Sequence, residues 1–119
     1  MQRTMLRVKI HRAVVSEADL NYVGSMTIPR DLMKRLDILE GEQCDVVNIN
    51  SGERWTTYVI AGQKPRHFCL NGAAARRGQP GDRIIIMLYA QMEEAEARAH
   101  HLRIAILNDR NEVEKILPE

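Results

Sequence analysis

Apolar and polar residues alternate along several short segments of the chain. In the first of them, residues 3–11, the even positions are mostly apolar, whereas Lys9 and His11 share the opposite face. Alternation with a period of two predicts a strand with one buried face. Further strands are predicted at residues 22–28 (interrupted by Gly24-Ser25), 44–49, 54–61, 67–70, 83–90 and 102–107.

Short helices are predicted between some of these strands. Ser16 followed by Asp19 resembles a capping box and predicts a helical turn at residues 17–21. Pro29 suits the first position of a helix whose apolar residues then recur at helical spacing, and Gly41 is predicted to end that element.

The last part of the chain predicts one more helix and one more strand. Residues 91–100 are acidic near their start and carry Arg98 near their end, as the helix dipole favours. The polar tail from Asn108 is predicted to lie beyond the last strand. Many short strands with brief helices and Gly/Pro turns indicate a mainly β fold, a small closed β-barrel. The 119 residues contain no internal repeat and no linker, so we expect one domain over residues 1–119.

Charge and composition argue against several classes of function. The chain has 17 Lys and Arg residues and 16 Asp and Glu residues, so it lacks the concentrated cationic face that binds a nucleic acid. One Trp, three Tyr and one Phe are too few for a platform that stacks bases. The longest apolar run, Ile84 to Ala90, has seven residues, and a membrane-spanning helix needs about 20. The start of the chain has no apolar block typical of a signal peptide, and we expect a cytoplasmic protein.

Signals for metal or phosphate binding are weak. The four histidines share no spacing suited to a metal ion, and no glycine-rich loop could bind a phosphate. Cys44 and Cys69 stand alone in strand-like segments, as expected of buried reduced thiols. We therefore expect no bound metal.

One set of polar residues remains as a candidate functional site. Lys9 and His11 share a face of one predicted strand, and Arg54 and Tyr58 share a face of another. Thr57 points the opposite way unless a β-bulge changes its direction. Taken alone, this spacing favours the solvent-exposed faces of amphipathic strands.

Several short motifs change that interpretation. They are RTML (3–6), KIHRA (9–13), ADLNYVGS (18–25), LEGE (39–42), NSGERWTTY (50–58), NGAAA (71–75) and PGD (80–82). Together they resemble the pyruvoyl-dependent aspartate 1-decarboxylase family over nearly the full length of the chain. The resemblance implies a small closed six-stranded double-psi β-barrel with short helices, and a homotetramer with active sites between neighbouring subunits.

The resemblance also implies that the chain is made as a proenzyme that cuts itself between Gly24 and Ser25. The products would be residues 1–24 and 25–119, with a covalently bound pyruvoyl group derived from Ser25 at the new terminus. A glycine before the serine offers an unhindered carbonyl and tolerates φ/ψ values that a side chain would forbid. The pyruvoyl group would take the place of pyridoxal phosphate, form a Schiff base with L-aspartate, and accept the electron pair left by CO₂.

The product would be β-alanine, a precursor of pantothenate, and the implied roles fall on named residues. Arg54 and Lys9 would hold the two substrate carboxylates, and Tyr58 would donate a proton to the carbanion. The remaining implied site residues are Thr57, Gly72, Ala73 and Ala74 for substrate binding, with His11, Tyr22 and Asn71 in support.

Two alternatives stay open at this point. Residues 25–47 also resemble a swapped-hairpin DNA-binding module, although that module has about half the length and a basic face. A relative that cuts itself but decarboxylates another amino acid is the second alternative.

Three segments depart from the family pattern: the loop at 62–68, the Arg76-Arg77 pair and the tail. These departures leave the need for a maturation partner undetermined.

Overall fold

The computed structural model describes residues 1–119 and is mainly β, with short helices, as predicted. The elements are β1 (Gln2–Val14), β2 (Glu17–Asp19), β3 (Ser25–Pro29), α1 (Arg30–Leu36), β4 (Gln43–Asn48), β5 (Arg54–Gly62), β6 (Cys69–Asn71), the 3₁₀ helix η1 (Gly72–Arg76), β7 (Arg83–Glu93), α2 (Glu94–Ala99), β8 (Arg103–Leu107) and β9 (Val113–Leu117).

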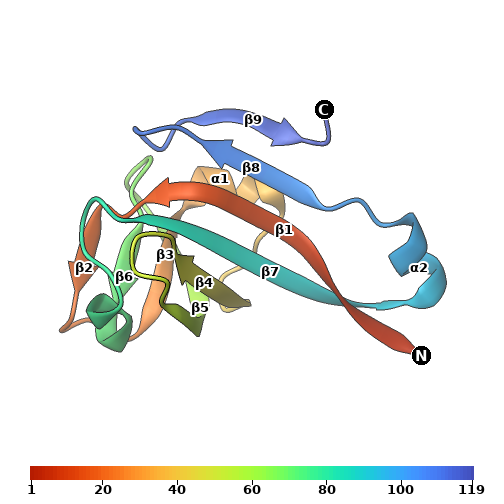
Figure 1. The fold of residues 1–119 in the computed structure, drawn as a ribbon, viewed down its shortest axis with the longest axis horizontal. Helices are drawn as coiled ribbons and strands as arrows, with labels where there is room; N and C mark the ends of the chain where they lie inside the picture. The colour runs from red at the N-terminus through yellow and green to blue at the C-terminus, as the bar shows by residue number, and fades with distance from the viewer.

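The strands are hydrogen-bonded in the order β2-β6-β3-β5-β4-β7-β1-β8-β9. Strands β1 and β7 run side by side along the length of the molecule (Figure 1). Closure into a six-stranded double-psi barrel stays a prediction.

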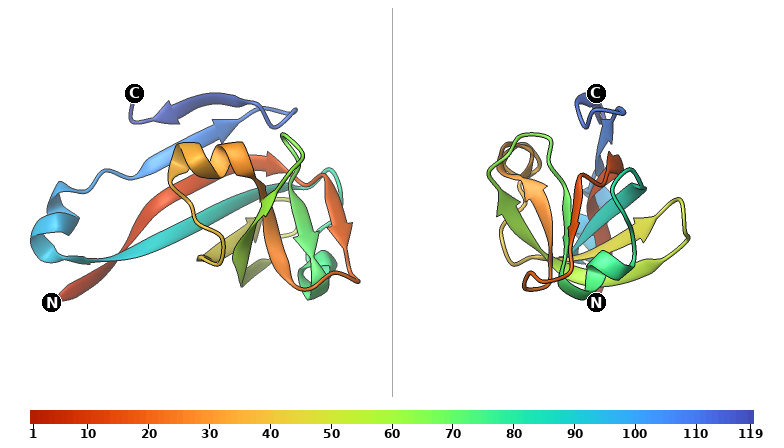
Figure 2. Two further views of the ribbon diagram at one scale, coloured as in Figure 1. Left: turned by 180° about the vertical axis from the view of Figure 1, so that it is seen from behind. Right: turned by 90° about the vertical axis from the view of Figure 1, so that its left-hand side faces the viewer.

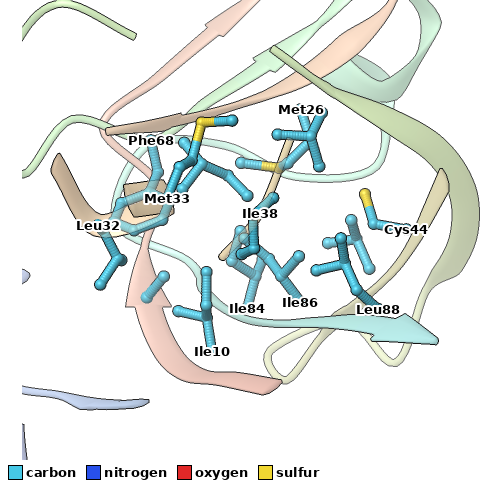
Figure 3. Close-up of a cluster of buried hydrophobic side chains, with 14 of the residues drawn as sticks. Ile10, Met26, Leu32, Met33, Ile38, Cys44, Phe68, Ile84, Ile86 and Leu88 are labelled. Carbon is cyan, nitrogen blue, oxygen red and sulfur yellow. The ribbon is translucent and has the colours of Figure 1, made fainter. Parts of the chain in front are cut away.

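The core is almost entirely aliphatic, as expected from the few aromatic residues. Ile10 of β1, Met26 of β3 and Ile86 of β7 have no exposed surface, and they point into the same interior (Figure 3). Seen end-on, the strands curve around this interior, and β9 lies at the outer edge (Figure 2). Cys44 and Cys69 are both buried and free, which confirms the prediction of reduced thiols.

The predicted helical turn at residues 17–21 is wrong. Residues Glu17–Asp19 form β2, which pairs in parallel with β6. The Ser16 hydroxyl does not cap a helix, because it accepts a hydrogen bond from the backbone N–H of Phe68 at 3.1 Å. The backbone N–H of Ser16 bonds the Phe68 carbonyl at 2.8 Å, so a long-range strand contact replaces the local cap.

Two predicted helix boundaries also need correction. Helix α1 ends at Leu36, before Gly41, because Asp37 adopts the left-handed conformation that terminates a helix (φ 56°). Residues 91–93 extend β7 and do not start α2, because they pair with residues 2–4 of β1. No helix of the structure is long and apolar enough to cross a membrane.

The tail contains a strand that was not predicted. Strand β9 pairs antiparallel with β8. Asn111, which precedes β9 in a left-handed conformation, is buried and bonds the backbone N–H and carbonyl of Val14 at 2.7 and 2.9 Å. The strand was not predicted because charged residues interrupt its apolar residues Val113, Ile116 and Leu117.

Candidate active site

Ser25 is buried at the start of β3 and lies opposite Asn71 at the end of β6. The two residues are partners in the antiparallel pairing of these strands, which places their side chains on the same face. Ser25 is only 1% exposed. The Asn71 Nδ2 group donates to Ser25 Oγ at 2.9 Å and to Thr27 Oγ1 at 2.8 Å. A buried serine hydroxyl is therefore held directly after the Gly24-Ser25 peptide bond.

The residue before Ser25 is packed against the glycine that starts η1. A Cβ atom added to Gly72 would lie 2.7 Å from Gly24 Cα and 3.0 Å from the carbonyl oxygen of Tyr22. Gly72 also has φ +69°, in the left-handed region, whereas Gly24 does not. The steric demand at this contact therefore lies at Gly72.

A cavity of about 470 Å³ opens beside this segment and is lined by both charged and small residues. Arg77 on its wall forms an ion pair with Glu53, whereas Arg76 forms none. Among the residues predicted for the site, the cavity is lined by Gly24, Thr57, Asn71, Ala73 and Ala74.

Arg54 and Tyr58 project from the face of β5 opposite to Thr57. Side chains alternate along a strand, and the burial of β5 alternates in the same way, with Arg54 and Tyr58 exposed and Thr57 half-buried. Tyr58 is 40% exposed. The structure therefore does not bring these two side chains to Ser25 of the same chain.

Lys9 and His11 lie on the same outer face as Arg54, but several strands away. His11 pairs with Ile85 of β7, Ile85 pairs with Val47 of β4, and Val47 pairs with Arg54. Three strand spacings separate His11 from Arg54, which is about 14 Å along the sheet. The predicted site residues thus form two groups, one around Ser25 and one on the outer face of the sheet.

Asp45 lies between the basic residues of the outer face and was missed by the sequence analysis. Its carboxylate accepts a hydrogen bond from the Thr56 hydroxyl at 2.6 Å and from the Tyr89 hydroxyl at 2.9 Å. Burial and then the bond to Asp45 raise the pKa of Tyr89, so that hydroxyl stays protonated. The sequence could have indicated Asp45, because the predicted hairpin places it opposite Thr56.

Of the three supporting residues predicted from the sequence, Asn71 lies at Ser25, whereas His11 and Tyr22 are in different surroundings. His11 is half-buried, and its Nδ1 atom has no hydrogen-bond partner. Burial, and then the charges of Lys9 and Arg12, lower the pKa of His11, so the ring is held neutral. Tyr22 is 51% exposed in the turn before Gly24.

Comparison with known proteins relates the chain to a single family. A family model described as aspartate decarboxylase matches residues 1–114. An aspartate 1-decarboxylase from Shouchella clausii is 54% identical over 98% of the chain and 93% of the relative. Those from Clostridium kluyveri and Bacillus cytotoxicus are 53% and 52% identical, each over 98% of the chain and 92% and 93% of the relative.

The chain therefore belongs to the aspartate decarboxylase family. This confirms the resemblance inferred from the motifs, and with it the expectation of an enzyme of the carboxy-lyase class.

Proposed function

We propose that the chain decarboxylates L-aspartate to β-alanine and CO₂, with a pyruvoyl group formed from its own Ser25. The observation that carries the proposal is the buried Ser25 hydroxyl, held by Asn71 directly after Gly24 and beside the cavity that Gly24 lines. The relatives' name, aspartate 1-decarboxylase, supports the choice of substrate. β-Alanine made in the cytoplasm would serve pantothenate biosynthesis.

The first step of the proposed maturation is an attack of Ser25 Oγ on the carbonyl carbon of Gly24. The new C–O bond forms as the peptide C–N bond breaks, and the hydroxyl proton passes to the Ser25 nitrogen. Elimination then removes the Ser25 Cα proton and releases the Gly24 carboxylate. Water adds to the resulting dehydroalanine and ammonia leaves, so residues 1–24 and 25–119 become separate chains. No side chain at Gly24 obstructs the attack.

Residues of the cavity support this chemistry by their position. The Nδ2 group of Asn71 holds Ser25 Oγ in place at 2.9 Å. Thr57 lines the same cavity as Gly24, and we assign its hydroxyl to assisting self-cleavage and later to binding substrate. The small side chains of Ala73 and Ala74 on the cavity wall leave room for a substrate to approach the backbone, and Gly72 allows that backbone to lie against Gly24.

The mature group fits these surroundings, because its position is buried beside a cavity with polar walls. When formed, the pyruvoyl group supplies an electron sink that no ordinary side chain offers. Arg54 binds one substrate carboxylate through two parallel N–H bonds, and Lys9, three strands away on the same outer face, extends its long side chain toward the second. Tyr58 holds a proton on its hydroxyl for the carbon that loses CO₂.

The two groups of site residues imply an oligomer. Arg54 and Tyr58 lie on the face of β5 opposite to Thr57, and their side chains do not line the cavity beside Ser25 of the same chain. We infer a homotetramer in which the outer face of β5 in one subunit closes the cavity of its neighbour. The exposed rings of Tyr58 and Tyr22 support such a contact, since exposed aromatics are common in interfaces.

The proposal is tested by measuring CO₂ release from L-aspartate, with L-glutamate and other amino acids offered in parallel. We expect release from L-aspartate by the wild-type enzyme and none by Ser25→Ala. If the enzyme releases CO₂ from another amino acid and not from L-aspartate, that amino acid is the substrate. If the protein instead binds DNA in a salt-dependent manner and releases no CO₂, the swapped-hairpin alternative is correct.

A further inference from the structure

One buried nucleophilic group has no part in the chemistry described so far, the thiol of Cys69. Cys69 lies in β6 two residues before Asn71, so both side chains are on the same face of the strand. It is 5% exposed. Its Sγ atom lies 3.0 Å from Asn71 Oδ1 and 3.8 Å from the carbonyl oxygen of Leu70. The thiol is therefore in contact with the amide that holds Ser25.

The direction of the Asn71 amide matters for the nucleophile. With Nδ2 toward Ser25, the hydroxyl oxygen accepts a hydrogen bond and its own proton stays free to leave. With the amide turned by 180°, Oδ1 would face Ser25, accept the hydroxyl proton and hold it on the oxygen that must attack.

The hydroxyls of Ser25 and Thr27 do not select between these two directions. A hydroxyl donates or accepts equally well, so both partners would be satisfied by either end of the amide. The thiol of Cys69, the third partner of the Asn71 amide, does select between the two directions, because it is an S–H donor and its sulfur is a poor acceptor. Only a carbonyl oxygen turned toward Cys69 makes that contact favourable.

The surroundings of Cys69 keep its donor in place. Burial raises the pKa of this thiol to about 11, so the proton stays on sulfur at neutral pH. The shorter contact is to Asn71 Oδ1 rather than to the Leu70 carbonyl, which favours donation to the amide.

We propose that Cys69 is a positioning residue for self-cleavage, whose S–H group fixes the Asn71 amide with Nδ2 toward Ser25. The bond leaves the Ser25 hydroxyl proton free to pass to the Ser25 nitrogen as Oγ attacks Gly24. Cys69 acts only through Asn71 and does not touch the reacting atoms. The inference rests on the proposed self-cleavage.

The test compares variants that keep or remove the donor. Cys69→Ser keeps a donor in place, whereas Cys69→Val fills similar space without one. Freshly synthesised chains are incubated, and the uncut fraction is followed by intact mass. We expect Cys69→Ser to cut at nearly the wild-type rate and Cys69→Val to cut roughly 3- to 10-fold more slowly. Cys69→Ala serves in place of Cys69→Val should the valine variant fail to fold.

Cys44→Val is the matched control, because Cys44 is a buried thiol of the core with no bond to Asn71. We expect it to cut at the wild-type rate. The inference is overturned if Cys69→Val matches the wild type, or if Cys69→Ser is slowed as much as Cys69→Val. A wild-type chain that never cuts would instead refute the proposed function, so the two failures are distinguishable.

Discussion

Gly72 lies against Gly24 with no space for a side chain between them. A Cβ atom at Gly72 would lie 2.7 Å from Gly24 Cα and 2.9 Å from Gly24 N. These are backbone atoms, which cannot move aside as the end of a flexible side chain can. The segment that carries the proposed cleavage site is therefore positioned by direct contact between two stretches of backbone, β6–η1 and the turn before β3.

Gly72→Ala is expected to displace the Gly24-Ser25 segment. The substitution adds a clash to a left-handed backbone, so we expect the free energy of unfolding, measured by urea denaturation, to fall by roughly 1–3 kcal/mol. We also expect self-cleavage, followed by intact mass, to be at least about 10-fold slower. That decrease in rate corresponds to about 1.4 kcal/mol on the activation barrier.

Gly81→Ala is the control for backbone strain alone. Gly81 also has positive φ (+96°), but a Cβ atom there would meet nothing within 4 Å. We expect it to destabilise the fold by about 1 kcal/mol and to leave self-cleavage unchanged. If both variants cut normally, contact between Gly72 and Gly24 is not needed for the reaction.

Mixed oligomers test the sharing of the site between subunits. Arg54→Ala and Ser25→Ala chains are each expected to be inactive alone. When they are co-expressed in equal amounts, a site with Ser25 from one chain and Arg54 from its neighbour forms in about a quarter of positions. We therefore expect about a quarter of the wild-type CO₂ release. Mixed oligomers without activity would show that both groups must come from one chain.

The neutral state of His11 predicts a dependence of stability on pH. Because its pKa is lowered from the ordinary value of 6.5, the unfolded chain binds a proton more readily than the folded one as the pH falls. The stability linked to His11 is full above pH 6.5 and is lost as the pH falls through the lowered pKa of the folded state.

His11→Gln removes this titration and keeps a polar side chain. The free energy of unfolding, measured in urea at pH 7.5 and pH 5.5, is expected to fall more for the wild type than for His11→Gln. Equal losses in the two proteins would mean that the ring of His11 is not disfavoured in its charged form.

The sequence predicted the fold best where local signals and long-range pairing agree. Residues 44–49 and 54–61, with the turn at Asn50-Ser51-Gly52, correspond to β4 and β5 within one residue at each end. The prediction failed at residues 17–21, where Ser16 bonds Phe68, more than 50 positions away, instead of capping a helix. It also failed in the tail, because β9 is defined by its pairing with β8.

The candidate site could be predicted only in part, because some of its contacts depend on long-range strand pairing. Motifs drew attention to Ser25 and Asn71, but only the pairing of β3 with β6 joins these residues, which lie 46 positions apart. The separation of Arg54 and Tyr58 from Thr57 followed from alternation alone. Cys69 was considered only as a buried thiol, although its spacing of two residues from Asn71 on a predicted strand already placed both on one face.

The intact mass of freshly purified enzyme that releases CO₂ from L-aspartate tests the central claim most directly. We expect two masses, those of residues 1–24 and of residues 25–119 with a keto acyl group in place of the terminal serine. An enzyme of full activity that shows a single mass, that of the uncut chain with its serine intact, would contradict the account.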